Sequence, residues 1–152
     1  MKNESVLIRP VAAEDLSEVL SLCALHASYE KLPFQESGQE ARWRADLFAE
    51  SPRFWCMVAV AGEEIIGYAT CMKQYATWDA SHYLYLDCLF MKETFRGQGV
   101  GERLMEEVKA RARTLGCELI QWQTPAFNTR AMKFYHRLGA QSKSKERFFL
   151  NP

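Results

Sequence analysis

Apolar and polar positions follow each other along the chain with two different periods. Short apolar runs bounded by turn residues predict strands, whereas apolar side chains recurring every three to four positions predict helices. The clearest helical pattern lies in residues 99–115 and ends at Gly116, a residue suited to capping a helix. The expected strands are residues 5–9, 54–60, 65–74, 82–91, 118–123 and 147–150. The expected helices are residues 13–27, 39–48, 99–115 and 129–137.

This order of elements, β-α-α-β-β-β-α-β-α-β, predicts the fold class. The runs at residues 54–60 and 65–74 are separated by a short turn and form a hairpin pattern, which makes those two strands antiparallel. Together with the helices, the pattern favours an α/β sandwich of the α+β kind, with a mixed, mostly antiparallel sheet flanked by helices. The length of 152 residues fits a single domain over residues 1–152.

Charge and cysteine content narrow the class of protein. Lys and Arg number 19, as do Asp and Glu, so the formal net charge is zero and favours neither nucleic acid nor a membrane surface. The N-terminal residues lack the apolar run of a signal peptide, and no stretch approaches the roughly 20 apolar residues of a membrane span. The five cysteines are scattered without a C-x-x-C pair, which argues against a zinc site and a disulfide framework. We therefore expect a cytoplasmic protein with no metal, nucleic-acid or membrane partner.

The strongest local motif is the glycine-rich segment Arg96-Gly97-Gln98-Gly99-Val100-Gly101, which leads from strand 82–91 into the next helix. Glycines leave the backbone amides uncrowded and permit positive φ angles. The start of the helix adds unpaired N–H groups and a partial positive charge. Such a segment can hold a pyrophosphate through its backbone. The alternative is an ordinary tight turn that binds no ligand.

Three kinds of ligand-binding loop share this richness in glycine. A P-loop ends in Gly-Lys-Ser or Gly-Lys-Thr, but here Gly101 is followed by Glu102. A dinucleotide-binding fingerprint has the spacing G-x-G-x-x-G in an early β-α-β unit, whereas this chain has G-x-G-x-G far from its N-terminus. The third loop, R/Q-x-x-G-x-G/A, belongs to the GNAT superfamily of N-acetyltransferases, and Arg96, Gly99 and Gly101 match it.

A second motif strengthens this resemblance. Residues 128–140 read Asn-x-x-Ala-x-x-Phe-Tyr-x-x-x-Gly-Ala, which resembles the second signature of the GNAT family. The Ile8-Arg9-Pro10 opening and the order of elements are similar to the family as well. Within the family, the chain looks most like the diamine (spermidine/spermine) acetyltransferase-like branch, on Tyr29-Glu30, Leu84-Tyr85-Leu86-Asp87 and Phe134-Tyr135. That branch usually has glutamate where this chain has Asp87.

The resemblance implies direct transfer of acetyl from acetyl-CoA to an amine, without an acyl-enzyme. The amine must lose a proton, because an alkylammonium has a pKa of about 10, and the departing thiolate must gain one. We expect Tyr135 to be the proton donor, seven residues after Asn128. We expect Asp87, acting through water, to be the base, since it is the one acidic residue between His82 and Met91.

Both roles have a structural alternative. Tyr135 could pack in the core beside Phe134 with its hydroxyl bonded to backbone, and Asp87 could be bonded to neighbouring loop amides.

Strict alternation along strand 82–91 predicts two faces. One face carries Tyr83, Tyr85, Asp87, Leu89 and Met91, and the other carries Leu84, Leu86, Cys88 and Phe90.

The coenzyme contacts implied by the resemblance fall in three segments. Strand residues Leu89, Phe90 and Met91 are expected to pair with the pantetheine arm through their backbone. Asn128 and Arg130 are expected at the distal part of the coenzyme, although Asn128 could also be the N-cap of helix 129–137. The expected pyrophosphate cradle comprises Arg96, Gly97, Gln98, Gly99, Val100, Gly101 and Glu102.

The acceptor end is less distinct in the sequence. The loop residues expected near the acceptor are Tyr29, Glu30, Glu36, Asp79 and Glu146, together with Asp87 of strand 82–91. Any of these loop charges could instead simply be solvated. We expect a small polyamine-like or amino-acid amine as the substrate. The alternatives are a protein or aminoglycoside acceptor, or a non-catalytic sensor of acetyl-CoA. Because many members of the diamine branch are homodimers, we also expect a homodimer, with strand 147–150 as an apolar pairing edge.

Overall fold

The computed structural model describes residues 5–152 and contains five strands and four α-helices. The strands are β1 (Val6–Pro10), β2 (Trp55–Ala61), β3 (Glu64–Ala76), β4 (Ser81–Met91) and β5 (Ile120–Gln121). The helices are α1 (Leu16–Tyr29), α2 (Gln39–Leu47), α3 (Val100–Thr114) and α4 (Thr129–Arg137). Short 3-10 helices, Ala13–Asp15 and Glu93–Phe95, precede α1 and α3. The order of elements predicted from the sequence is therefore confirmed as far as α4.

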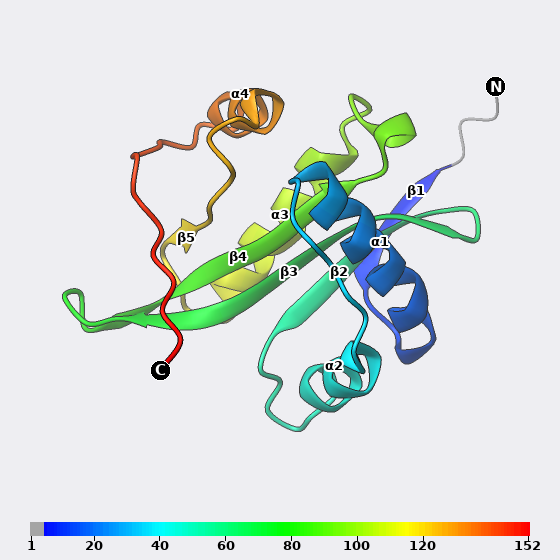
Figure 1. Cartoon of the computed structure of the whole chain (residues 1–152), viewed down its shortest axis with the longest axis horizontal. Helices are drawn as coiled ribbons and strands as arrows, with labels where there is room; N and C mark the ends of the chain where they lie inside the picture. The colour runs from blue at the N-terminus through cyan, green and yellow to red at the C-terminus, as the bar shows by residue number, and fades with distance from the viewer. Residues whose placement is uncertain (1–4) are drawn as a thin grey trace.

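The five strands form one sheet in the order β1-β2-β3-β4-β5 (Figure 1). Neighbouring strands are antiparallel except β4 and β5, which are parallel and pair only at Leu84 with Ile120 and Tyr85 with Gln121. The predicted fold class, a mixed and mostly antiparallel sheet flanked by helices, is confirmed. Because β5 is so short, most of the outer edge of β4 lies beyond its pairing with β5.

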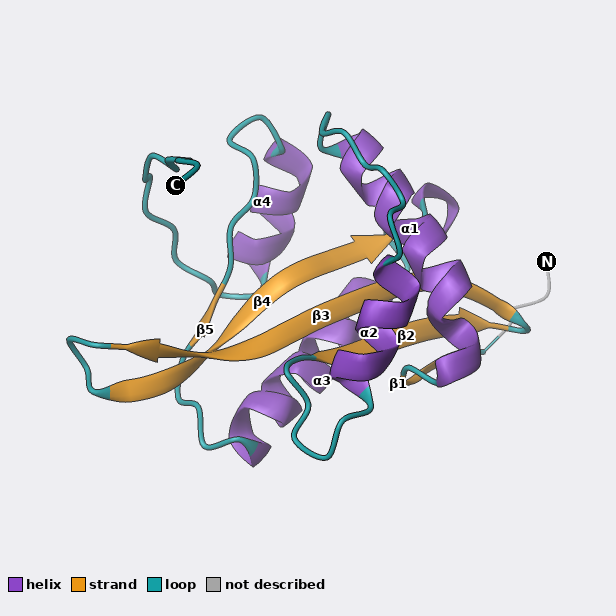
Figure 2. Ribbon diagram, turned by 60° about the horizontal axis from the view of Figure 1, so that its bottom comes forward, coloured by secondary structure: helices purple, strands orange, loops and turns teal. Residues whose placement is uncertain are grey.

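Helices cover both faces of the sheet (Figure 2). On one face, Leu16 and Val19 of α1 pack with Val58 of β2 in an apolar cluster that also includes α2. On the other face, Leu104 and Val108 of α3 belong to a second cluster with alternate residues of β2 and β3. Central strands buried on both sides explain why β2 is an almost unbroken apolar run.

A bulge interrupts β4 at Asp87. Cys88 and Leu86 pair with consecutive residues of β3, so Asp87 between them has no partner in the ladder. The strict alternation expected from the sequence, which placed Leu86 on the same face as Cys88, is wrong. The extra residue resets the alternation, so that Leu86 and Leu89 both pack in the α3 cluster while Cys88 packs in the α1 cluster.

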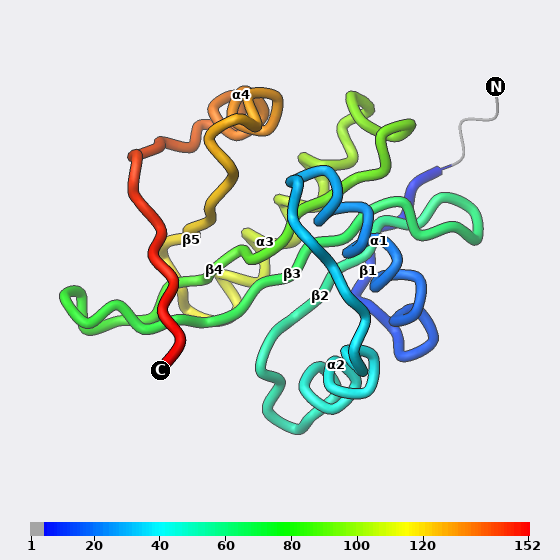
Figure 3. Tube along the Cα trace, in the orientation of Figure 1, coloured from blue at the N-terminus to red at the C-terminus, as the bar shows by residue number. Residues whose placement is uncertain are grey.

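The chain after α4 has no regular structure, and the strand predicted over residues 147–150 is wrong. Figure 3 traces this segment away from α4 to the C-terminus. Phe148, Phe149 and Leu150 are 89%, 81% and 93% exposed. Strand propensity alone does not make a strand, because a strand needs a hydrogen-bonding edge beside it. Within residues 5–152, this segment pairs with no strand.

The helices are short. The longest among the described residues is α3, with 15 residues, whereas crossing a bilayer takes about 20 apolar residues in a helix. Within residues 5–152, no helix combines the length and the apolar character that a membrane span requires.

Candidate active site

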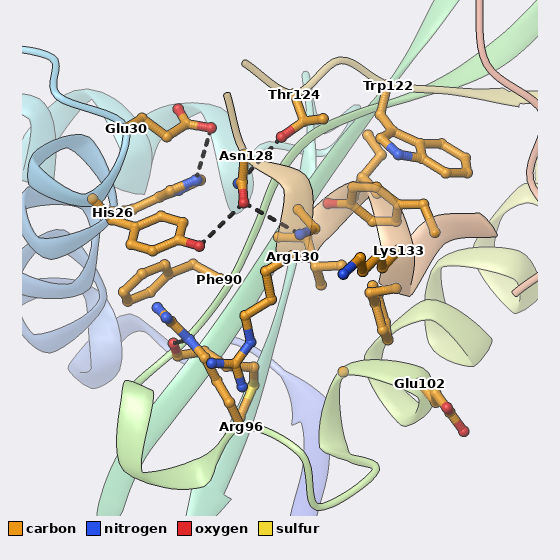
Figure 4. A pocket seen from close by; sticks show the side chains of 18 of the residues that line it. His26, Glu30, Phe90, Arg96, Glu102, Trp122, Thr124, Asn128, Arg130 and Lys133 are labelled. Atoms are coloured by element: carbon orange, nitrogen blue, oxygen red, sulfur yellow. Dashed lines mark hydrogen bonds and ion pairs between the residues drawn. The ribbon is translucent and has the colours of Figure 1, made fainter. Parts of the chain in front are cut away.

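A pocket of about 570 Å³ opens where β4 leads into α3. Its walls come from the end of α1, from β4, from the glycine-rich loop, from residues 122–128 and from α4 (Figure 4). Most of the residues singled out in the sequence meet here although they are far apart along the chain. Those that line the pocket are Tyr29, Glu30, Asp87, Leu89, Phe90, Met91, Arg96, Gly97, Gly99, Gly101, Glu102, Asn128, Arg130 and Tyr135.

Five of the expected site residues do not line the pocket. The Val100 side chain is buried in the α3 cluster, and the Gln98 side chain donates to the carbonyl of Thr94 at 3.1 Å. Only the backbone amides of these two residues can take part in binding at the loop. The other three expected residues are exposed and lie outside the pocket walls: Glu36, Asp79 and Glu146.

The glycine-rich loop presents a row of free backbone donors. Among the described residues, the amides of residues 97–102 donate to no backbone carbonyl and no side chain; the first helical hydrogen bond of α3 runs from Arg103 N to Gly99 O. Gly97 and Gly99 have φ angles of +75° and +79°, a conformation that other residues rarely adopt. Free amides at a helix start attract an anion.

Gly101 has a different role, set by close packing. A Cβ built on Gly101 would lie 3.2 Å from Cζ of Phe134 on α4, so a side chain there would press on that ring. The glycine therefore lets α4 approach the beginning of α3. This contact brings the α4 side of the pocket next to the free amides.

Arg96 ties the loop to the end of β4. Its Nε donates to the carbonyl of Met91 at 2.9 Å, and its guanidinium lies 4.5 Å from the ring centroid of Tyr29 and 5.4 Å from that of Phe90. These contacts hold a permanent positive charge inside the pocket, beside α1. Arg130, Lys133 and Arg137 of α4 also line the pocket, so the α4 wall is basic.

Asn128 organises the junction between α1 and α4. Its side-chain oxygen accepts from Ala131 N at 3.2 Å, which confirms that Asn128 is the N-cap of α4. The same oxygen accepts from the Tyr29 hydroxyl at 3.1 Å, and its Nδ2 donates to the Thr124 hydroxyl at 3.3 Å. Figure 4 shows Asn128 beside Thr124, with the hydrogen bonds of its side chain as dashed lines. Asn128 is only 8% exposed, so its polar atoms are engaged mainly with the protein itself.

The outer edge of β4 is open beside the loop. β5 pairs with β4 only at Leu84 and Tyr85, and among the described residues no strand continues along residues 86–91 on that side. Leu89, Phe90 and Met91 line the pocket there. An open strand edge can pair with an extended ligand that carries amide groups.

Asp87 reaches the pocket because of the bulge. As the extra residue of the bulge it is released from the strand alternation, and it is exposed, with its carboxylate in the pocket wall. Among residues 5–152, its one side-chain hydrogen bond is a long contact of 3.9 Å from the Cys88 thiol. The carboxylate is thus able to accept a proton or a hydrogen bond from a ligand.

Tyr135 is held by its ring and not by its hydroxyl. The ring makes an edge contact with Trp122, with centroids 5.1 Å apart, and packs beside Phe134. In the described part of the chain the hydroxyl makes no hydrogen bond, and it lies in the pocket. Burial, and then the negative charge of Glu30, raises the pKa of Tyr135 to about 12. The phenol therefore stays protonated at neutral pH and can donate.

Sequence reasoning missed several lining residues, of which His26 and Trp122 stand out. His26 lies in the last turn of α1, and its ring stacks on Phe90 with centroids 5.1 Å apart. Trp122, directly after β5, supports the Tyr135 ring. Neither residue belongs to a motif, so only its position in the fold reveals it.

The pocket fits coenzyme A. The free amides of residues 97–102 suit a pyrophosphate, the basic side chains of α4 suit further phosphate, and the open edge of β4 suits the amides of the pantetheine arm. A Cβ added at Gly97 or Gly99 would meet nothing within 4 Å, so the space in front of the loop is open.

Comparison with known proteins agrees with this geometry. The sequence has 35% identity over 144 residues to a thialysine N-epsilon-acetyltransferase of Bos taurus, covering 90% of this chain and 84% of that protein. It has 25% identity over 146 residues to spermidine/spermine N(1)-acetyltransferase-like protein 1 of Homo sapiens, covering 91% of this chain and 21% of that protein. These relatives agree with the resemblance to diamine acetyltransferases found in the sequence.

The fold also has solved neighbours. An aminoglycoside N-acetyltransferase in complex with CoA superposes with a TM-score of 0.82, at 21% sequence identity, covering 99% of this chain and 97% of that chain. At this identity the likeness concerns the fold. The sequence model of the Acetyltransferase (GNAT) family matches residues 18–140, most of the chain. The protein therefore belongs to the GNAT acetyltransferase family.

Proposed function

We propose that this protein transfers acetyl from acetyl-CoA to an amine of a small cationic substrate, polyamine-like or amino-acid-like. One observation carries the proposal. A single pocket joins a row of free amides and basic side chains to the carboxylates of Glu30 and Asp87, with the free hydroxyl of Tyr135 in the same space. The first group of residues suits the coenzyme, and the second suits an ammonium.

The chain's own residues bind and orient the co-substrate. The amides of residues 97–102 and the Arg96 guanidinium hold the pyrophosphate, and Arg130 adds positive charge at the distal end. The open edge of β4 at Leu89 to Met91 pairs with the pantetheine arm as a short additional strand. When bound, the coenzyme supplies an acetyl thioester, which is already activated for transfer.

The reaction then needs one proton acceptor and one proton donor. Asp87, through a water molecule, takes a proton from the substrate ammonium, which frees the nitrogen lone pair. The nitrogen attacks the thioester carbonyl carbon, so that a C–N bond forms and the C–S bond breaks. Tyr135 donates a proton to the sulfur that leaves as a thiolate, which completes the coenzyme A thiol. The second proton, which the nitrogen loses as the amide forms, restores the Tyr135 phenol, so the net release is the one proton taken up through Asp87.

The acceptor class follows from the charge of the other wall. Glu30 and Asp87 line the same pocket, and both carboxylates act electrostatically on His26 of α1. An acceptor with two positive charges can use both, one at the reacting nitrogen and one at the far end. The thialysine and spermidine/spermine relatives support this choice, because their names refer to molecules with more than one amine.

We further propose that residues 1–152 act as one domain, that the protein works in the cytoplasm and that it forms a homodimer. The single sheet supports the first statement. The second is supported by the five cysteines, all of which are free. The exposed Phe148, Phe149 and Leu150 support a pairing surface for a second copy. Light scattering on the full chain and on a Phe148→Ser, Phe149→Ser variant tests the dimer.

The central experiment measures release of coenzyme A thiol from acetyl-CoA with a panel of linear polyamines, lysine analogues, aminoglycosides and lysine peptides. We expect turnover with the small cationic amines, and a kcat about 100-fold lower in Tyr135→Phe. Tyr83→Phe is the matched control, because the Tyr83 hydroxyl donates to Gln74 outside the pocket.

Other outcomes separate the alternatives. Turnover only with aminoglycosides or peptides would replace the proposed acceptor while keeping the chemistry. Tight binding of acetyl-CoA without turnover on any amine would favour a sensor. Failure to bind the coenzyme at all would overturn the proposal.

A further inference from the structure

His26 is a pocket residue that the proposed chemistry does not yet use. Its side chain is 13% exposed, and it lies between the Phe90 ring on β4 and Glu30, one turn further along α1. Its Nδ1 is 2.9 Å from the Tyr68 hydroxyl, and its Nε2 is 3.5 Å from Oε1 of Glu30. Figure 4 shows the imidazole directed at the Glu30 carboxylate.

The contacts with Glu30 and Tyr68 together indicate which nitrogen of His26 carries the proton, because a carboxylate near Nε2 can only accept. Tyr68 is 1% exposed, and burial raises the pKa of its hydroxyl above the ordinary value, so that the hydroxyl keeps its proton. When this hydroxyl donates to Nδ1, the imidazole proton must sit on Nε2. The Nε2–H then faces the carboxylate of Glu30, which is itself only partly exposed.

We infer that His26 is a positioning residue, which holds the Glu30 carboxylate in place as the anchor for the second positive charge of a dicationic acceptor. This inference rests on the proposed function and makes the acceptor class more specific. Asp87 serves the nitrogen that reacts, and Glu30 serves the distal ammonium. A neutral imidazole orients the Glu30 carboxylate and leaves its negative charge in place. An arginine or lysine at this position would cancel that charge.

The charged groups around His26 come from three segments. Glu30 of α1 and Asp87 of β4 favour its protonated form, while burial and Arg96 from the glycine-rich loop oppose it. Burial is the largest effect, and the pKa of His26 lies below its ordinary value. The imidazole is therefore neutral at neutral pH. In acid it becomes an imidazolium that pairs with Glu30 and weakens the attraction of Glu30 for a cationic acceptor.

The test compares two substitutions on a linear diamine and on a monoamine of the same length. In His26→Leu, which keeps apolar bulk against Phe90 but has no donor, we expect the KM for the diamine to rise about fivefold. The KM for the monoamine, the KM for acetyl-CoA and kcat should change little. A general structural defect would shift all four.

His26→Gln is the conservative variant that should restore the KM for the diamine lost in His26→Leu. Glutamine offers an N–H near the position of Nε2 but does not titrate, so its KM for the diamine should equal that of the parent at pH 8. In the parent protein this KM should rise on acidification more steeply than in His26→Gln. Amine protonation affects both proteins equally and cancels in the comparison. His82→Gln, an exposed histidine at the start of β4, is the control for loss of a histidine.

Calorimetric binding of the diamine separates this inference from the proposed function. If the parent binds the diamine about fivefold more tightly than His26→Leu but acetylates no amine, the inference stands and the proposed function fails. If the parent acetylates the diamine and both substitutions leave its KM unchanged at every pH, the inference is overturned. Equal shifts for the diamine and the monoamine, or no binding of the diamine by the parent, would also overturn it.

Discussion

The two ends of the pocket present different parts of the polypeptide to the ligands proposed for them. At the coenzyme end, the donors are backbone amides of one continuous segment, residues 97–102, backed by the start of α3. At the acceptor end, the groups are side chains from three elements that are far apart in sequence: Glu30, Asp87 and Tyr135. The groups of the first end belong to one sequence motif, whereas the groups of the second end come together only in the folded chain.

This difference has a functional consequence. Backbone amides are independent of side-chain identity, so the coenzyme end tolerates substitution except where a glycine is required. Side-chain carboxylates can be moved or replaced one at a time, which lets the acceptor end change its specificity while the coenzyme end stays the same. Substitutions at the two ends should therefore affect different kinetic constants.

The largest effect is expected at Asp87. Asp87→Asn removes the proposed proton acceptor but keeps the size of the side chain, so kcat should fall about 100-fold while the KM for acetyl-CoA stays within about twofold. Asp87→Glu retains a carboxylate and should recover much of this loss. Steady-state kinetics with the best diamine checks both, with Asp79→Asn in the exposed β3–β4 turn as the control. An unchanged kcat in Asp87→Asn would assign the base elsewhere.

A smaller effect is expected at Glu30. Glu30→Gln removes the carboxylate charge proposed to attract the distal ammonium, so the KM for a diamine should rise about tenfold, whereas the KM for a monoamine should hardly change. Glu36→Gln, at an exposed position in the loop between α1 and α2, is the matched control. Equal effects on the diamine and the monoamine would show that Glu30 does not discriminate acceptors by charge.

The smallest effect is expected for alanine substitutions at the glycines that flank the two ends of α3. Gly99 and Gly116 both have positive φ angles, +79° and +70°, and a Cβ at either would meet nothing within 4 Å. Alanine at either position should cost about 1 kcal/mol in the free energy of unfolding. Only Gly99→Ala should also weaken acetyl-CoA binding, by about fivefold. Thermal denaturation and calorimetry check the pair, and equal coenzyme affinities would argue against the glycine-rich loop as the binding site.

Much of the fold could be predicted because its signals are local. The helical period of α3, the capping Gly116 and the N-cap Asn128 each depend on residues within a few positions of one another, and the structure confirms them. The strand predictions failed where the presence of a neighbouring strand decides whether a segment becomes a strand. The segment 147–150 has the apolar residues of a strand but no edge to join within the described chain, and residues 118–123 form a strand only at Ile120–Gln121.

The sequence by itself determined the family, the order of elements and the glycine-rich loop, because motifs of that kind act through neighbouring residues. The tertiary structure alone decided how the acceptor end is built. The bulge that turns Asp87 into the pocket arises from the register between β3 and β4. The approach of His26 to Tyr68 and Glu30 depends on how α1 packs on the sheet. Contacts between distant segments carry no local pattern, so they become visible only when the chain is folded.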